Sequence, residues 1–117
     1  MRENIIVNKT VDFSLKIIKL YKYLCEEKKE YIMSKQILRS GTSIGANVRE
    51  AVNSQSKKEF IAKMNISLKE VSETEYWLEL LIKSNYIDEF QAKNIVFDCS
   101  EIAKIIISII KTSNNQK

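Results

Sequence analysis

Glu75 is the acidic residue whose position is best suited to chemistry. It interrupts a row of apolar residues that recurs every three or four positions from Ile61 to Ile82, a spacing typical of the buried face of a helix. A carboxylate in such a place requires a cation or several hydrogen-bond donors, and Arg39 and Arg49 are the candidate cations. No nucleophile or second acid is evident beside it, so we expect Glu75 to form a buried structural ion pair and not to catalyse a reaction.

The other residues that usually carry catalysis or bind metals are scarce. The sequence has no histidine, the commonest general base and metal ligand. Cys25 and Cys99 lie 74 positions apart, which matches no metal or redox motif, so two free core thiols are expected. An enzyme would require Glu75 or Glu70 to face an open pocket and not a packed interface. We therefore expect no enzymatic activity, no metal and no cofactor.

A basic stripe on the first predicted helix is the candidate for nucleic-acid binding. It comprises four lysines on one flank and a tyrosine beside them: Lys9, Lys16, Lys19, Lys22 and Tyr23. Lysines neutralise phosphates and a tyrosine ring stacks on bases, although lysines are also ordinary on the solvated face of a helix. The net charge is +4, with +6 in residues 1–63 and −2 in residues 64–117. The basic excess therefore falls in the same half of the chain as the stripe.

Four amphipathic helices must position these residues. The apolar spacing predicts helices over about residues 8–28, 33–55, 57–84 and 89–111, followed by a frayed tail at 112–117. Ser56 with Glu59, and Asp88 with Gln91, are typical of the capping boxes that open helices. The chain has no proline and two glycines, which argues against sandwiches, barrels and loop-rich enzymes. Short connections between long helices make neighbours antiparallel, so we predict an all-α fold: one domain, residues 1–117, forming an antiparallel up-down-up-down four-helix bundle.

The last predicted helix has more apolar surface than one bundle can bury. Its main apolar seam comprises Ala92, Ile95, Cys99, Ile102, Ile106 and Ile109. Outside this seam, a second stripe contains Val96, Ala103, Ile107 and Ile110. This surplus favours contact with a partner chain, most simply another copy, with Ile107, Ile110 and Trp77 as the candidate interface. A loop or the N-terminal arm folded over the stripe is the alternative, and Trp77 could equally pack in the core.

The second predicted helix contains two glycines, Gly41 and Gly45, on its apolar side. Each costs about 1 kcal/mol relative to alanine inside a helix, so we expect another element to approach the backbone closely there. A local kink is the alternative interpretation. We group both glycines with Glu75, Arg39 and Arg49 as buried structural positions.

Residues 34–51, SKQILRSGTSIGANVREA, closely resemble the hallmark segment of the four helix bundle protein family, also called the ribosomal RNA intervening-sequence protein family. The resemblance extends from about Ile5 to Thr112 and includes FIAK at 60–63 and ETEYWLE at 73–79. Family members were noticed as reading frames inside insertions in bacterial large-subunit ribosomal RNA genes. The resemblance implies a cytoplasmic four-helix bundle that assembles into a ring-like homopentamer and has no established enzymatic activity. A related branch, the accessory protein of diversity-generating retroelements, is a basic pentamer that binds nucleic acid and a reverse transcriptase.

Together these observations predict a non-enzymatic, oligomeric bundle protein that binds RNA or DNA through a basic surface. The expected partners are other copies of the chain, RNA or DNA, and a reverse transcriptase or other protein. The alternative is a scaffold for protein interactions without nucleic-acid binding, in which the positive charge keeps the assembly soluble. The longest apolar stretch, residues 105–110 with Ser108 inside it, is much shorter than the roughly 18 residues of a membrane span. Residues 1–6 show no targeting signal. We therefore expect a cytoplasmic protein with no membrane partner.

Overall fold

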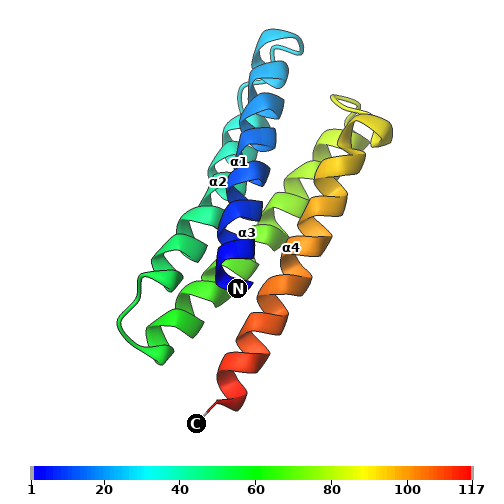
Figure 1. Ribbon diagram of the computed structural model, residues 1–117. Helices are drawn as coiled ribbons and strands as arrows, with labels where there is room; N and C mark the ends of the chain where they lie inside the picture. The colour runs from blue at the N-terminus through cyan, green and yellow to red at the C-terminus, as the bar shows by residue number, and fades with distance from the viewer. Residues whose placement is uncertain (1, 117) are drawn as a thin grey trace.

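The computed structural model describes the backbone of residues 2–116 and the side chains of residues 4–116. It contains four helices: α1 (Arg2–Glu26), α2 (Met33–Val52), α3 (Lys57–Lys83) and α4 (Glu89–Asn115). Each helix runs antiparallel to the one before it, and α4 returns to the side of α1 (Figure 1). The bundle is elongated, with principal extents of 50 × 21 × 20 Å. The predicted all-α four-helix bundle is confirmed.

One hydrophobic core runs through the bundle. The apolar seam expected for α4 is buried along its whole length: Ala92, Ile95, Cys99, Ile102, Ile106 and Ile109. The first two helices bury Ile6, Phe13, Ile17, Leu24, Ile37, Ile44, Val48 and Ala51 against it. Each large aliphatic side chain removed from water contributes about 1.5–3 kcal/mol. This shared burial, and not helix propensity, holds the four helices in register.

The helix ends differ from those expected. α1 begins at Arg2 and not near residue 8, because the fully buried Ile6 extends its core seam by another turn. α2 stops at Val52 and not at residue 55. Just beyond its end, the Ser54 hydroxyl donates to the Ala51 carbonyl at 2.6 Å. The frayed tail is wrong for residues 112–115, which are helical as far as Asn115. Residue 117 lies outside the described residues.

A buried carboxylate closes the connection between α1 and α2. Glu30 is 7% exposed, and its oxygens accept hydrogen bonds from the backbone N–H groups of Ile32 (3.1 Å), Met33 (3.0 Å) and Ser34 (2.7 Å). N–H groups at the start of a helix have no partner within the helix, and negative charge is favoured there by the helix dipole. Glu30 thus caps α2. It supplies the capping hydrogen bonds that the side chain of Ile32, the N-cap residue, does not make.

Replacing this capping carboxylate should destabilise the bundle measurably. We expect Glu30→Ala to lower the free energy of unfolding by about 2 kcal/mol, since the variant leaves three N–H groups, the buried one of Ser34 among them, without their charged acceptor. The matched control is Glu27→Ala in the same connection, where the side chain is exposed and the change should stay within about 0.5 kcal/mol. Urea unfolding followed by circular dichroism measures both, and equal losses would contradict the capping role.

Two glycines on α2 mark a tight contact with α1. A Cβ atom added at Gly41 would lie 2.8 Å from Cγ1 and 2.9 Å from Cγ2 of Ile17. At Gly45 the added atom would lie 3.2 Å from Cβ and Oγ1 of Thr10. α2 continues as one helix through both positions. The glycines therefore serve close helix packing.

Candidate interaction surfaces

The basic stripe on α1 is divided by its contacts with α4. Lys9 Nζ lies 2.7 Å from Glu101 Oε1, and Lys16 Nζ lies 2.6 Å from Asp98 Oδ2. The Tyr23 hydroxyl accepts a hydrogen bond from Gln91 Nε2 at 3.2 Å. Three of the five residues proposed for nucleic-acid binding thus hold the α1–α4 seam together.

The remaining two lysines of the stripe face solvent. Lys19 and Lys22 are exposed, and neither forms an ion pair with any side chain among residues 4–116. Lys19 also borders a hollow of about 410 Å³ between α1 and α4, beside Leu20 and Tyr23. These two positions are the part of the stripe that remains open to an external anion.

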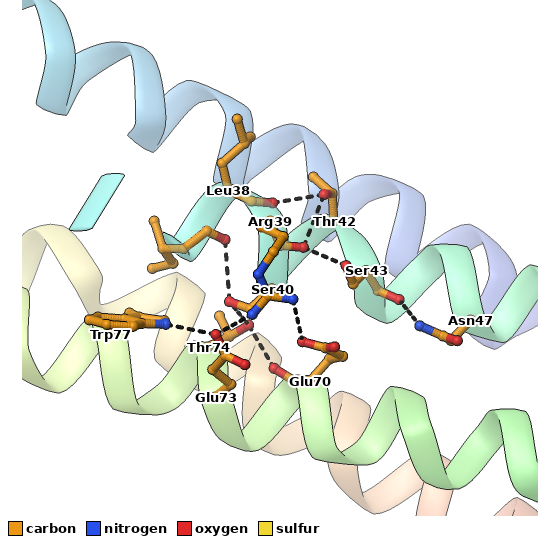
Figure 2. Close-up of polar contacts among 11 residues, drawn as sticks. Leu38, Arg39, Ser40, Thr42, Ser43, Asn47, Glu70, Glu73, Thr74 and Trp77 are labelled. Atoms are coloured by element: carbon orange, nitrogen blue, oxygen red, sulfur yellow. Dashed lines mark hydrogen bonds and ion pairs between the residues drawn. The ribbon is translucent and has the colours of Figure 1, made fainter. Parts of the chain in front are cut away.

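Arg39, one of the two cations proposed to meet Glu75, is engaged elsewhere. Its guanidinium donates to Glu70 Oε1 at 3.4 Å and to Glu73 Oε2, joining the exposed edges of α2 and α3 (Figure 2). Trp77 Nε1 donates to the same Glu73 oxygen at 3.0 Å. The hydrogen bonds from Arg39 and then from Trp77 hold the pKa of Glu73 below its usual value of 4.5. Trp77 is half-buried against the core and tied into this network.

The fluorescence of Trp77, the single tryptophan of the chain, should report the protonation of Glu73. A carboxylate with a lowered pKa contributes stability above its unfolded pKa, and this stability is lost as pH falls through the lower folded value. We therefore expect the acid transition of Trp77 fluorescence below pH 4.5. Arg39→Gln should move its midpoint upward, because the largest cause of the lowered pKa is gone.

The matched control for this titration is Lys83→Gln. Lys83 pairs with Glu79 at 2.9 Å on the solvent side of α3 and is not among the groups that shift the pKa of Glu73. Its removal should leave the midpoint in place. An Arg39→Gln midpoint equal to that of the unmodified protein would show that Arg39 does not set the pKa of Glu73.

The expected burial of Glu75 is wrong. Glu75 is exposed, as are Arg39 and Arg49, and the interior position belongs to its neighbour Thr74. The Thr74 hydroxyl donates to the Glu70 carbonyl at 2.8 Å and lies 2.9 Å from the Ser40 hydroxyl. These hydrogen bonds allow polar residues of α3 to be buried against α2. The side of α3 that carries Thr74 therefore faces the interior, and Glu75 lies on the exposed side.

Ser67 repeats the same arrangement two turns earlier on α3. It is fully buried, and its hydroxyl donates to the Ile44 carbonyl of α2 at 2.8 Å. Small polar side chains therefore line the seam between α2 and α3. Apolar spacing does not predict that these side chains are buried, since serine and threonine are polar and are assigned to the exposed face of a helix.

A groove between α3 and α4 forms one exposed apolar surface of the bundle. This α3–α4 groove has a volume of about 630 Å³, and its lining residues are Glu75, Leu78, Glu79, Ile82, Lys83, Glu89, Lys93, Val96 and Phe97. Val96 is 45% exposed and Phe97 is 59% exposed. Of the residues proposed for an oligomer interface, Ile107 is 40% exposed, whereas Ile110 is half-buried against the core. Sequence analysis missed Phe97 and the 84% exposed Phe90, although their seven-residue spacing places them on one face of α4.

A second apolar surface lies on the α1–α2 hairpin. This α1–α2 surface surrounds a hollow of about 270 Å³, lined by Thr10, Val11, Ser14, Leu15, Gly45, Ala46 and Arg49. Val11 is 41% exposed and Leu15 is 60% exposed. Their four-residue spacing outside the main seam of α1 was the available sequence signal. Contiguous exposed apolar side chains with a polar rim are typical of protein interaction sites.

The cysteines are not placed for chemistry. Burial, and next the nearby negative charge of Glu75, raises the pKa of the Cys99 thiol to about 12, so it stays protonated and inert near neutral pH. Cys25 is half-buried with its Sγ 3.7 Å from the Ser34 hydroxyl.

Over the described residues, no group of three or more histidine, cysteine or acidic side chains is arranged to hold a metal ion. In that same part of the chain, every helix is too short or too polar to traverse a lipid bilayer.

Comparisons with known proteins place this bundle in a family. A family model for the 23S rRNA-intervening sequence protein matches residues 2–108. A crystal structure of a protein with unknown function from the S23 ribosomal protein family of Bacteroides thetaiotaomicron has a TM-score of 0.93, with 57% identity over 95% of this chain and 99% of that chain. A search of curated proteins finds no match. Because the family match reaches into all four helices and the same bundle recurs in a closely similar sequence, the chain belongs to the 23S rRNA-intervening sequence protein family.

Proposed function

We propose that this protein is a non-enzymatic, cytoplasmic helical bundle that self-associates and, as an oligomer, binds RNA or DNA. The observation that carries the proposal is the pair of exposed apolar surfaces, one on each hairpin. Leu15 and Phe97 are about equally exposed, at 60% and 59%. A single bundle leaves both in water, whereas a neighbouring copy would bury them.

The nucleic-acid part of the proposal depends on the exposed lysines of α1. Lys19 and Lys22 extend into solvent, and each assembled copy adds another such pair to the surface. Residues 1–63 carry a charge of +6, which attracts phosphates over a distance of about one Debye length, roughly 8–10 Å in physiological salt. Repetition of a weak phosphate site in an oligomer raises its overall affinity.

Self-association is tested by the mass of the protein in solution. We expect light scattering at micromolar concentration to give a multiple of the 13.6 kDa chain, and the family resemblance implies a fivefold multiple. Ile107→Lys and Phe97→Glu change exposed side chains, so they test two regions of α4 without disturbing the core. A protein that remains a monomer at these concentrations would contradict the proposal.

The second candidate function is a protein-interaction scaffold that binds no nucleic acid. It is favoured by the ion pairs of Lys9 and Lys16, which use half of the lysines in the stripe to join α1 to α4. This candidate predicts the same oligomer but no binding of RNA or DNA even at low salt. Nucleic-acid binding by the purified oligomer therefore distinguishes the two functions.

A further inference from the structure

We propose that the hollow between α1 and α4 holds one unpaired nucleotide of a single-stranded nucleic acid, with its base inside the hollow and its phosphate on Lys19. The inference rests on the proposed nucleic-acid binding and specifies where the strand is held. This α1–α4 hollow has a volume of about 410 Å³, and pockets for small ligands typically measure roughly 300–1,000 Å³. It lies where the later turns of α1 run beside the first turns of α4 (Figure 1).

The floor of the α1–α4 hollow is apolar. Ile87 and Ile95 line it and are buried, and the half-buried Leu20 packs against the same core. The half-buried ring of Tyr23 adds an aromatic side chain to the lining. Bases stack on aromatic and apolar side chains, and their faces are open to such contact when the strand is unpaired. The floor therefore suits a base better than a phosphate.

The polar groups at the mouth of the hollow can bind the edge of a base. The amide of Gln91 is already engaged, since it accepts from the Asp88 backbone at 2.9 Å and donates to the Tyr23 hydroxyl at 3.2 Å. That hydroxyl keeps its own hydrogen to donate. The exposed side chain of Asn94 makes no hydrogen bond with residues 4–116. Its amide offers a donor and an acceptor side by side, the pattern with which asparagine binds base edges.

The charge around the hollow favours a phosphate. Among the described residues that line it, Lys16 and Lys19 are charged and none is acidic. Lys16 pairs with Asp98 at 2.6 Å, whereas Lys19 forms no ion pair with residues 4–116. Lys22 is also exposed, and side chains three residues apart on a helix lie close enough to contact neighbouring phosphates of one strand. A base in the hollow thus brings its own phosphate toward Lys19 and the next phosphate toward Lys22.

Other occupants fit the hollow less completely. A phosphate alone would pair with Lys19 and leave the apolar floor in water. An apolar side chain of another protein would cover the floor but shield Lys19 and the Asn94 amide from water without giving them partners, which is unfavourable. A base inside a duplex has its edge and both faces already occupied. A single unpaired nucleotide meets the floor, the amide and the cation together.

The decisive measurement compares two labelled DNA strands of equal length, one of mixed sequence and one abasic throughout. Both strands carry the same phosphate charge, so the lysines alone cannot distinguish them. We expect fluorescence anisotropy to show about tenfold tighter binding of the base-containing strand.

Asn94→Leu tests the contact with the base without changing the charge of the protein. We expect it to reduce the advantage of the base-containing strand from about tenfold to about twofold or less, and to leave binding of the abasic strand unchanged. Asn65→Leu, the same change at an exposed position of α3, is the matched control and should preserve the full advantage. Circular dichroism verifies that both variants are folded.

The side-chain amide resonance of Asn94 gives a second readout that needs no variant. In NMR spectra of isotope-labelled protein, we expect this resonance to shift when the base-containing strand is added. The abasic strand, or inorganic phosphate at the same concentration, should leave it in place. A shift of equal size with all three would show that phosphate alone causes it, and the base assignment would be wrong.

The outcomes separate this inference from the proposed function. If neither strand binds at low salt, nucleic-acid binding itself fails, and this inference with it. If both strands bind equally well, or if Asn94→Leu keeps the full advantage, the base is not held in the α1–α4 hollow, while phosphate binding by the exposed lysines stands.

Discussion

Replacing Gly41 by leucine is expected to lower the free energy of unfolding by about 2 kcal/mol or more. The first atom of any side chain at this position already falls 2.8 Å from Ile17 Cγ1. Ile17 is fully buried and branched at its Cβ atom, so it cannot turn aside into solvent. Forcing extra carbons into a packed core typically costs 1–3 kcal/mol or more, which exceeds the gain of about 1 kcal/mol from removing glycine from a helix.

Gly45→Ala is the matched comparison on the same helix. Its added carbon would lie 3.2 Å from Thr10, and Gly45 is only half-buried, so a small shift of the neighbour makes room. We expect this variant to stay within about 1 kcal/mol of the unmodified protein, because steric cost and helix propensity oppose each other.

A second-site change tests the cause of the Gly41 effect. Ile17→Ala alone should cost about 2–5 kcal/mol through the cavity it leaves. Combined with Gly41→Leu, it should cost at least about 1–2 kcal/mol less than the sum of the two single changes, since the leucine enters the vacated space. Urea unfolding of the four proteins gives the coupling, and strict additivity would show that Ile17 is not the obstacle.

The sequence predicts the buried faces of three helices well because their apolar spacing is regular. All six seam residues expected for α4 are buried, and the capping box of Asp88 and Gln91 is present at its start. These features depend on local chemistry. A capping side chain bonds to the backbone at the start of the same helix. A row of apolar residues at helical spacing is buried when that face of the helix packs against the core.

Apolar spacing does not predict the buried face of α3, because that face is partly polar. Besides the bond of Thr74 to the Glu70 carbonyl within α3, the buried Ser67 and Thr74 hydroxyls meet the Ile44 carbonyl and the Ser40 hydroxyl of α2. Those partners are 23 and 34 residues away in sequence. The rotation that exposes Glu75 is therefore a property of how two helices pack, which no single helix pattern contains.

The candidate surfaces show the same limit. Lys9 and Lys16 are spaced like ordinary surface lysines, and their acidic partners lie on a helix more than 80 residues later. Whether they meet depends on the register of α1 against α4. Sequence analysis could therefore find a basic stripe but could not divide it into lysines that join helices and lysines that remain exposed.

That division yields a prediction for nucleic-acid binding with a large expected effect. We expect Lys19→Gln with Lys22→Gln to weaken binding of generic RNA or DNA by at least about tenfold at low salt, equally for all sequences tested. Each lysine lost from a phosphate contact should also lower the slope of log affinity against log salt by about 1. Fluorescence anisotropy with a labelled single strand, repeated over a salt series, measures both quantities.

The control pair is Lys9→Gln with Lys16→Gln, which removes the same charge from the same helix. These lysines form ion pairs with Glu101 and Asp98. Replacing them therefore leaves two carboxylates at the seam between α1 and α4 without their cations. Their replacement should lower stability by no more than about 1 kcal/mol per ion pair, since exposed pairs contribute little, and should leave the salt slope of binding unchanged. Equal losses from both pairs would mean that net charge alone attracts nucleic acid, and no loss from Lys19 and Lys22 would favour the scaffold. A defined phosphate site requires the two pairs to differ, because the structure leaves only one of them free to reach a phosphate.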